Sequence, residues 1–174
     1  MTCIAVKIKG KVIEIAGDTQ ASWGKNKMPW GVQQDKQTKV NGKLFEVNGM
    51  HFGCAGSVSD IGLLQIFCKT HRPKEMNRDD IMEWFIEFKE WLNDKAKVSF
   101  NDVNIHGIIA SEGKVFTFYD FMEVSEVTDF NAVGSGMWLA LGAMENGASV
   151  SQAVATAIKY DLNCGGDVTM KIIK

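Results

Sequence analysis

The order of strand-like and helix-like segments constrains the fold of this chain more than any other feature of its sequence. Strand patterns come first, two helix patterns follow, strands resume, and a second pair of helices precedes a last strand. Strands grouped in blocks, rather than alternating singly with helices, are typical of α+β proteins with antiparallel sheets. Two such sheets packed face to face, with a helix pair on each outer side, satisfy this order. We therefore expect a four-layer αββα sandwich.

Turn residues delimit the strands of the first block. Residues 4–16 predict a hairpin with its turn at Lys9-Gly10-Lys11, and residues 43–55 predict a second one around Asn48-Gly49. Asn and Gly both tolerate positive φ angles, which makes this pair a strong hairpin signal. Residues 17–38 lack the pattern and predict a loop with a short ribbon. The remaining strands are predicted over residues 103–110, 115–119, 123–127, 131–133 and 168–173.

Apolar spacing and capping residues predict four helices. Ser57 offers an N-cap for the first, and the second begins near residues 77–80. The third is expected over Met137–Glu145. Ser149 and Gln152 have the spacing of a capping box and begin the fourth.

Composition limits the classes of function that remain open. The chain has 174 residues, which predicts a single domain over residues 1–174. A formal charge of −2 argues against nucleic-acid binding and against a polybasic membrane surface. The four cysteines are scattered and no His pair has metal-ligand spacing, so we expect no cofactor and no metal. No signal-peptide pattern is present, and a cytoplasmic protein with reduced thiols is expected.

The start of the chain offers a candidate nucleophile. Thr2 follows Met1 directly and stands just before the first predicted strand. Because aminopeptidases favour a small second residue, a mature N-terminal Thr is plausible. Its hydroxyl can attack while its own α-amine, which titrates at about 7.7–8.0 in small peptides, accepts the proton. Many chains begin Met-Thr without this function, so other residues must support it.

Five short motifs along the chain give that support. In order they are GDTQAS at residues 17–22, KLFEV at 43–47, GCAGS at 53–57, GSG at 134–136 and DLNCGG at 161–166. Together they resemble the β-type subunits of the proteasome family, including the HslV-type bacterial protease. The similarity covers nearly the whole chain. It implies the N-terminal-nucleophile (Ntn) hydrolase fold, which is the αββα sandwich expected from the order of elements.

The resemblance implies a catalytic group around Thr2, which would be the nucleophile and, through its free amine, the general base. Asp18 and Lys43 match a buried acid–lysine pair, in which the ammonium would keep the amine neutral and favour loss of the hydroxyl proton. Ser135 and Asp161 match residues that hydrogen-bond around the amine. Retention of Met1 would turn the amine into an amide and remove the base.

The resemblance also implies where substrate binds. The backbone N–H of Gly56 matches the donor to the oxyanion. Substrate would lie extended between residues 19–22 and 55–56, which include Ser22 and Ala55, and would add a strand by main-chain hydrogen bonds. The residues that match an apolar first specificity pocket are Ala21, Phe45, Cys54 and Val58.

Several of these residues also have an ordinary structural explanation. Asp18 after a glycine is typical of a turn, Ser135 between glycines of an N-cap, and Lys43 of an exposed strand edge. Lys39 is a rival for the lysine of the pair, because the loop before it cannot be aligned. An acid such as Asp161 at a helix C-terminus opposes the dipole, which favours a functional role.

The implied function is a threonine peptidase subunit that hydrolyses unfolded polypeptides within a homo-oligomeric ring, a hexamer or heptamer, single or stacked. The resemblance also implies an ATP-dependent unfoldase as a possible partner. The sequence leaves open whether one is required, since the chain has no ATP-binding motif of its own. One departure is Cys164, where many relatives have Ser, which alters the local hydrogen bonding. Two alternatives stay open: a catalytically inactive ring or scaffold subunit, and a small-molecule amidase of the same fold.

Overall fold

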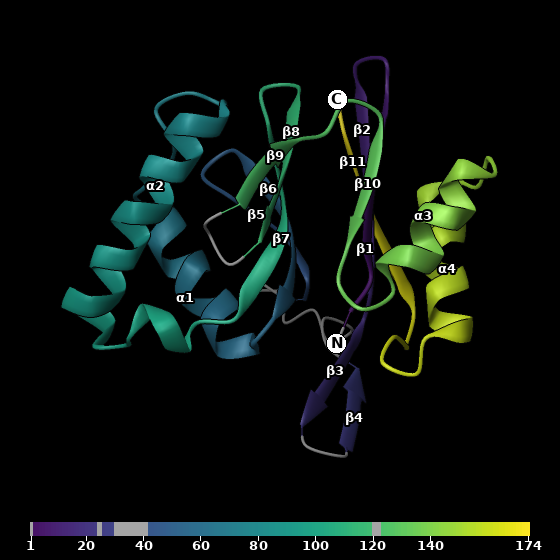
Figure 1. Cartoon of the computed structure of the whole chain (residues 1–174), viewed down its shortest axis with the longest axis horizontal. Helices are drawn as coiled ribbons and strands as arrows, with labels where there is room; N and C mark the ends of the chain where they lie inside the picture. The colour runs from purple at the N-terminus through teal and green to yellow at the C-terminus, as the bar shows by residue number, and fades with distance from the viewer. Residues whose placement is uncertain (1, 24–25, 30–41, 120–122) are drawn as a thin grey trace.

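A computed structural model of the chain describes residues 2–23, 26–29, 42–119 and 123–174. Four layers lie side by side in this part (Figure 1). Helices α1 (Val58–Cys68) and α2 (Arg78–Trp91) cover one sheet, and helices α3 (Met137–Glu145) and α4 (Val150–Tyr160) cover the other. The expected α+β class and αββα sandwich are therefore confirmed.

Both sheets are antiparallel throughout. The strand order is β5-β6-β7-β8-β9 in the five-stranded sheet and β10-β1-β2-β11 in the four-stranded sheet. The strands of the two sheets are β1 (Ile4–Lys9), β2 (Val12–Asp18), β5 (Leu44–Val47), β6 (Met50–Gly56), β7 (Ile105–Ser111), β8 (Lys114–Tyr119), β9 (Glu123–Glu126), β10 (Phe130–Val133) and β11 (Val168–Ile173).

A small ribbon extends beyond the end of β2. It consists of β3 (Gln20–Trp23) and β4 (Asn26–Pro29), and Figure 1 shows it projecting from the body of the molecule. This hairpin is the short ribbon predicted within residues 17–38. The rest of that predicted loop, and Lys39 after it, lie outside the described residues.

Local sequence signals place most element ends. Asn48 and Gly49 have φ angles of 51° and 74°, as a two-residue turn between twisted antiparallel strands requires. Ser149 and Gln152 form both hydrogen bonds of the predicted capping box. Ser57 occupies the N-cap position of α1, but its side chain makes no capping bond. Helix α2 is followed directly by a π-helical turn over Leu92–Ala96.

Three apolar layers fill the space between the four layers of backbone. The aromatic layer lies between α1, α2 and the five-stranded sheet, and includes Phe45, Phe52, Phe67, Trp84, Phe85, Phe88, Phe116 and Phe118. Aliphatic side chains fill the space between the sheets, among them Ile4, Val6, Ile13, Ile15 and Ile108. The small-residue layer lies beneath α3 and α4, and includes Cys3, Ala5, Ala16, Ala132, Ala140, Ala153, Ala157 and Cys164.

The start of the chain lies in the middle of the four-stranded sheet. In β1, Ile4 is paired with Val133 of β10 on one side and with Gly17 of β2 on the other. Thr2 therefore extends from β1 between the segment that follows β10 and the end of β2. This position, near the N label in Figure 1, brings three distant parts of the sequence together. None of the described helices has both the length and the apolar character needed to cross a bilayer.

Candidate active site around Thr2

A buried ion pair joins the end of β2 to the start of β5. Lys43 Nζ lies 2.7 Å from Asp18 Oδ1, and the two side chains are 4% and 0% exposed. The same oxygen accepts the backbone N–H of Cys3 at 2.9 Å, and Oδ2 accepts the N–H of Gly165 at 3.2 Å. Buried charges require such partners. Lys43 is thus no exposed edge lysine, and Asp18 is the last residue of a strand rather than a turn residue.

Burial and the charge of Asp18 have opposite effects on the pKa of Lys43. Burial lowers the pKa of Lys43, while the charge of Asp18 and its hydrogen bond raise it, and the net direction is downward. Burial also raises the pKa of the neighbouring Cys3 thiol, so that it stays uncharged. The described residues next to Thr2 therefore include the Lys43–Asp18 ion pair, with the neutral thiol of Cys3 beside it.

The carbonyl of Thr2 is anchored by the segment after β10. It accepts the N–H of Gly136 at 3.3 Å and the hydroxyl of Ser135 at 3.4 Å. Gly134 has a φ of +94°, and a Cβ there would lie only 2.1 Å from the Thr2 oxygen. The N-cap of α3 is Gly136, so Ser135 is not the capping residue that its position between glycines suggested. Thr2 itself is only 3% exposed.

Ser135 and Asp161 are brought together, with Cys164 beside both. Asp161, at the C-cap of α4, accepts the Cys164 thiol at 3.3 Å and the N–H of Asn163 at 2.9 Å. The Ser135 hydroxyl lies 3.8 Å from the Cys164 sulfur. Burial raises the pKa of Asp161, but hydrogen bonds from Asn163, Ser135 and Cys164 lower it, and the result is below its ordinary value. Burial raises the pKa of Cys164 to about 12, which leaves it a hydrogen-bond donor.

Two polar residues that received no individual role from the sequence fix the loop that contains Asp161. The hydroxyl of Thr19 accepts the N–H of Asp167 at 2.8 Å, and Gln20 Nε2 donates to the carbonyl of Asn163 at 3.3 Å. A Cβ on Gly165 would lie 2.1 Å from Gln20 Oε1. The Gly-Gly pair at 165–166 was the available sequence signal for this close approach.

The predicted oxyanion donor ends β6. The N–H of Cys54 donates to the carbonyl of Lys43 at 2.8 Å, on the β5 side of the strand. Successive N–H groups of a strand point to opposite sides, so the N–H of Gly56 also points toward the β5 side. Gly56 pairs with Ile105 in β7 and is exposed. Its N–H therefore faces the edge of β6 at which Lys43 lies.

The predicted substrate residues lie in several environments. Phe45 and Cys54 are buried in the aromatic layer, where Phe45 stacks on Phe52 with ring centroids 5.0 Å apart. Ala55 is buried in β6, whereas Val58 at the start of α1 is 48% exposed. Ala21 and Ser22 belong to β3, and Ala21 is half-buried. Their role in specificity stays a prediction.

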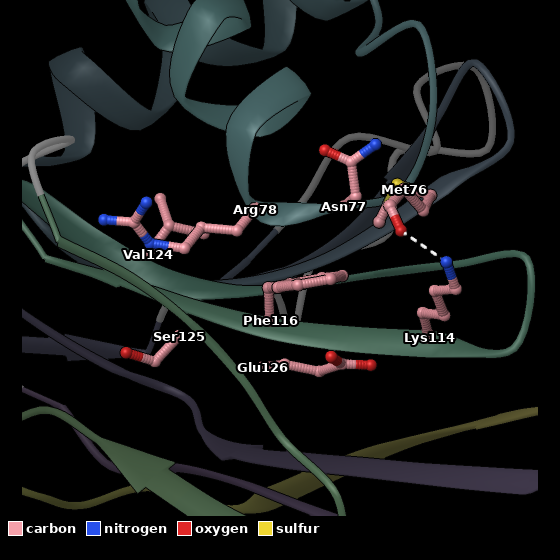
Figure 2. Close-up of a pocket in the computed structure, with 8 residues that line it drawn as sticks. All are labelled: Met76, Asn77, Arg78, Lys114, Phe116, Val124, Ser125 and Glu126. Carbon is pink, nitrogen blue, oxygen red and sulfur yellow. Dashed lines mark hydrogen bonds between the residues drawn. The ribbon is translucent and has the colours of Figure 1, made fainter.

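A pocket lies elsewhere, between the N-terminus of α2 and strands β8 and β9 (Figure 2). It has a volume of about 370 Å³, and Met76, Arg78, Lys114, Phe116 and Val124 are among its lining residues. It contains none of the predicted site residues. In the described ranges, no cluster of three or more His, Cys, Asp or Glu side chains could hold a metal ion.

No protein-family model matches the chain. Among solved structures, BPH from Thiobacillus denitrificans is similar, with 21% identity over 99% of this chain and 97% of that chain, at a TM-score of 0.80. BPH in complex with epoxomicin gives 20% identity over 99% and 98% of the two chains, also at 0.80. Eukaryotic HslV from Trypanosoma brucei gives 18% identity over 99% of each chain, at 0.65.

These matches extend over nearly the full length of every chain compared. They agree with the αββα layers built from the sequence, and the HslV match agrees with the family that the five motifs resemble. The chain therefore has the fold of BPH and of HslV, and its resemblance to HslV-type members of the proteasome family is confirmed at the level of the fold.

Proposed function

We propose that this chain is a threonine-type peptidase subunit, which hydrolyses peptide bonds of unfolded polypeptides once Met1 has been removed. The observation that carries the proposal is the buried pair of Lys43 and Asp18, joined to the backbone N–H of Cys3 immediately after Thr2. Burying an ion pair is costly in desolvation. The ion pair is bonded to the residue next to a potential N-terminal nucleophile, so a catalytic role would account for a buried pair at this position.

The proposed reaction proceeds through an ester of Thr2. The Thr2 hydroxyl oxygen attacks the scissile carbonyl carbon, and its proton passes to the α-amine. The N–H of Gly56 stabilises the oxyanion of the tetrahedral intermediate. The carbon–nitrogen bond then breaks, the leaving amine takes the proton, and an acyl ester remains on Thr2. Water attacks the ester with the same amine as base, which releases the acid and restores the hydroxyl.

The residues around Thr2 have distinct parts in this scheme. The Lys43 ammonium disfavours a second positive charge on the amine and favours loss of the hydroxyl proton. Asp18 holds Lys43 in place through the 2.7 Å contact. Ser135 and Gly136 fix the Thr2 carbonyl, and Asp161 accepts the thiol of Cys164 beside Ser135.

The proposal includes assembly into a homo-oligomeric ring. A single domain of 174 residues does not enclose a chamber, and the fold is shared with HslV. We place the ring in the cytoplasm, where the four cysteines, all free and buried, would stay reduced. The ring order, hexamer or heptamer, and an ATP-dependent unfoldase as partner are parts of the proposal that assembly measurements address.

The deciding experiment measures the state of residue 2 and its reactivity. Intact-mass spectrometry of the purified protein should show loss of Met1, and a peptide vinyl sulfone should label Thr2. Epoxomicin, which is bound in one of the BPH structures, is a second probe. Labelling should disappear in Thr2→Ala and persist in Thr70→Ala, a matched change at an exposed threonine outside the site.

The other outcomes separate the alternatives. A protein that retains Met1 and takes no label is not an N-terminal-threonine peptidase. A six- or seven-membered ring in native mass spectrometry without labelling indicates a scaffold subunit. A labelled monomer or dimer that cleaves small amides but no polypeptide indicates a small-molecule amidase.

A further inference from the structure

The backbone of Gly56 adopts a conformation that side chains rarely permit. Its φ is +122°, and a Cβ at this position would lie 2.1 Å from the carbonyl oxygen of Asn104. Asn104 lies immediately before β7, 48 residues further along the chain (104 − 56). Only a residue without a Cβ therefore fits at this position against the backbone of Asn104.

Asn104 also fixes the peptide group that follows Gly56. The N–H of Ser57 donates to the carbonyl of Asn104 at 2.8 Å. Before Gly56, β6 is held by its pairing with β7. The backbone is thus restrained on both sides of Gly56, and the hydrogen bond from Ser57 to Asn104 is a restraint that follows it.

Asp60 in turn holds Asn104. Its Oδ2 accepts the N–H of Asn104 at 3.0 Å, and its Oδ1 accepts the hydroxyl of Ser59 at 3.3 Å. The residue is only 8% exposed. An acid in the first turn of a helix ordinarily acts on the N–H groups of its own helix. Asp60 instead bonds to a segment outside α1.

Asp80 shows the ordinary arrangement in the same molecule. It lies in the first turn of α2, where its carboxylate accepts the side chain of the N-cap residue Asn77 at 2.6 Å. That contact stays within the start of one helix. The two first-turn acids therefore differ in whether they reach the proposed site.

We propose that Asp60 is a positioning residue for the oxyanion donor, acting through Asn104 on the backbone of Gly56. The inference rests on the proposed peptidase function and deepens it. No direct contact of Asp60 with substrate is involved. The carboxylate holds Asn104 N–H, the Asn104 carbonyl holds Ser57 N–H, and the N–H of Gly56 is thereby aimed at the developing charge.

Kinetics of peptide hydrolysis test the proposal with three variants. Asp60→Ala should lower kcat by roughly 10- to 100-fold with little change in KM, because misaiming a donor costs less than deleting it. Asp60→Asn should retain most of kcat, since its amide oxygen still accepts the Asn104 N–H. Asp80→Ala is the matched control and should retain kcat.

Labelling by the vinyl sulfone separates positioning from general damage. Addition of the Thr2 hydroxyl to the vinyl group forms an ether bond and generates no tetrahedral oxyanion from a carbonyl. Asp60→Ala should therefore label within about twofold of the wild-type rate, although hydrolysis falls. Unchanged hydrolysis in Asp60→Ala, equal loss of hydrolysis and labelling, or equal loss in Asp60→Asn would each overturn the positioning role. A wild-type protein that neither hydrolyses nor labels would instead refute the proposed function itself.

Discussion

The two helix pairs cover their sheets with opposite kinds of side chain. In the aromatic layer, the ring of Phe67 lies 5.6 Å from that of Trp84 and 5.0 Å from that of Phe88. In the small-residue layer, alanines such as Ala140 and Ala157 occupy the equivalent interface between helices and sheet. The aromatic layer buries a large apolar area, whereas the small-residue layer allows segments of backbone to approach one another closely.

Thr2 and the residues that anchor its carbonyl lie on the side of the small residues, whereas Gly56 belongs to the five-stranded sheet and Lys43 lies immediately before its strand β5. A Cβ on Gly136 would lie 2.8 Å from that of Ala157 and 2.9 Å from both Cys3 and Cys164. This lack of space brings the start of α3 and the loop after α4 against Thr2. The comparison teaches that large apolar area stabilises the fold, whereas close packing of small residues positions Thr2 and its anchors.

The largest expected effect is on stability, in the aromatic layer. Trp84 is fully buried among Phe52, Phe67 and Phe85, so Trp84→Ala should lower the free energy of unfolding by about 3–5 kcal/mol. Urea unfolding measures this change. The folded variant should still label Thr2 with the vinyl sulfone.

A milder variant sharpens the same prediction. The indole N–H of Trp84 has no hydrogen-bond partner within the described residues. Trp84→Phe should therefore cost less than Trp84→Ala, because it leaves a smaller cavity and removes an unsatisfied donor. Loss of labelling in a folded Trp84 variant would contradict the division between the two layers.

A substitution at Gly136 should change stability less than Trp84→Ala does, but it should change the reactivity of Thr2 more. Gly136→Ala should lower the free energy of unfolding by about 1–3 kcal/mol through overpacking. It should also lower the rate of labelling by roughly tenfold, because the added Cβ displaces the start of α3, whose Gly136 N–H holds the Thr2 carbonyl at 3.3 Å. Gly142→Ala in the same helix is the control: nothing lies within 4 Å of its added Cβ, and it should gain about 0.5–1 kcal/mol. Labelling of Gly136→Ala at the wild-type rate would be the contrary result.

The effect that is smallest near neutral pH is a dependence on alkaline pH that both layers should share. Burial raises the pKa of Cys54 in the aromatic layer and of Cys3 in the small-residue layer. Above the unfolded value of 9.0, the unfolded thiol loses its proton while the folded thiol keeps it. Below pH 9 the contribution of each thiol to the free energy of unfolding is therefore fully present. Above pH 9 the free energy of unfolding should fall by up to about 1.4 kcal/mol per pH unit for each thiol.

Unfolding free energies measured between pH 8 and 10.5 check this dependence. Cys54→Ala should show a shallower alkaline decline than the wild-type protein. Cys3→Ala should show the same change if the small-residue layer excludes water from Cys3 as well as the aromatic layer excludes it from Cys54. A decline in Cys54→Ala as steep as that of wild type would argue against ionisation of this thiol as its cause.

The fold was largely predictable because its signals are local. The Asn48-Gly49 turn, the capping box at Ser149 and the spans of α3 and β11 follow from residue types next to one another. The π-helical turn over Leu92–Ala96 was not predictable from spacing. It continues the backbone of α2 without a Gly or Pro to mark the change.

The site was predictable only in part, because its contacts join distant segments. Spacing alone left Asp18 and Lys43 open to ordinary explanations, and only the family resemblance paired them. Nothing in the sequence showed that Asp60 bonds to Asn104 across 44 residues. Such a contact depends on the pairing of β6 with β7, which places residue 104 beside residue 57.

The anchoring of Thr2 has a consequence for when the protein matures. Thr2 is held through its carbonyl by Ser135 and Gly136, and the next residue is held by Asp18, so folding buries it to 3% exposure. Under the proposed function the site is therefore built by folding, and it becomes active only when Met1 is removed. Expression in cells with slowed methionine aminopeptidase should yield protein with an unchanged free energy of unfolding. The vinyl sulfone should label it in proportion to the fraction that has lost Met1, which intact-mass spectrometry measures.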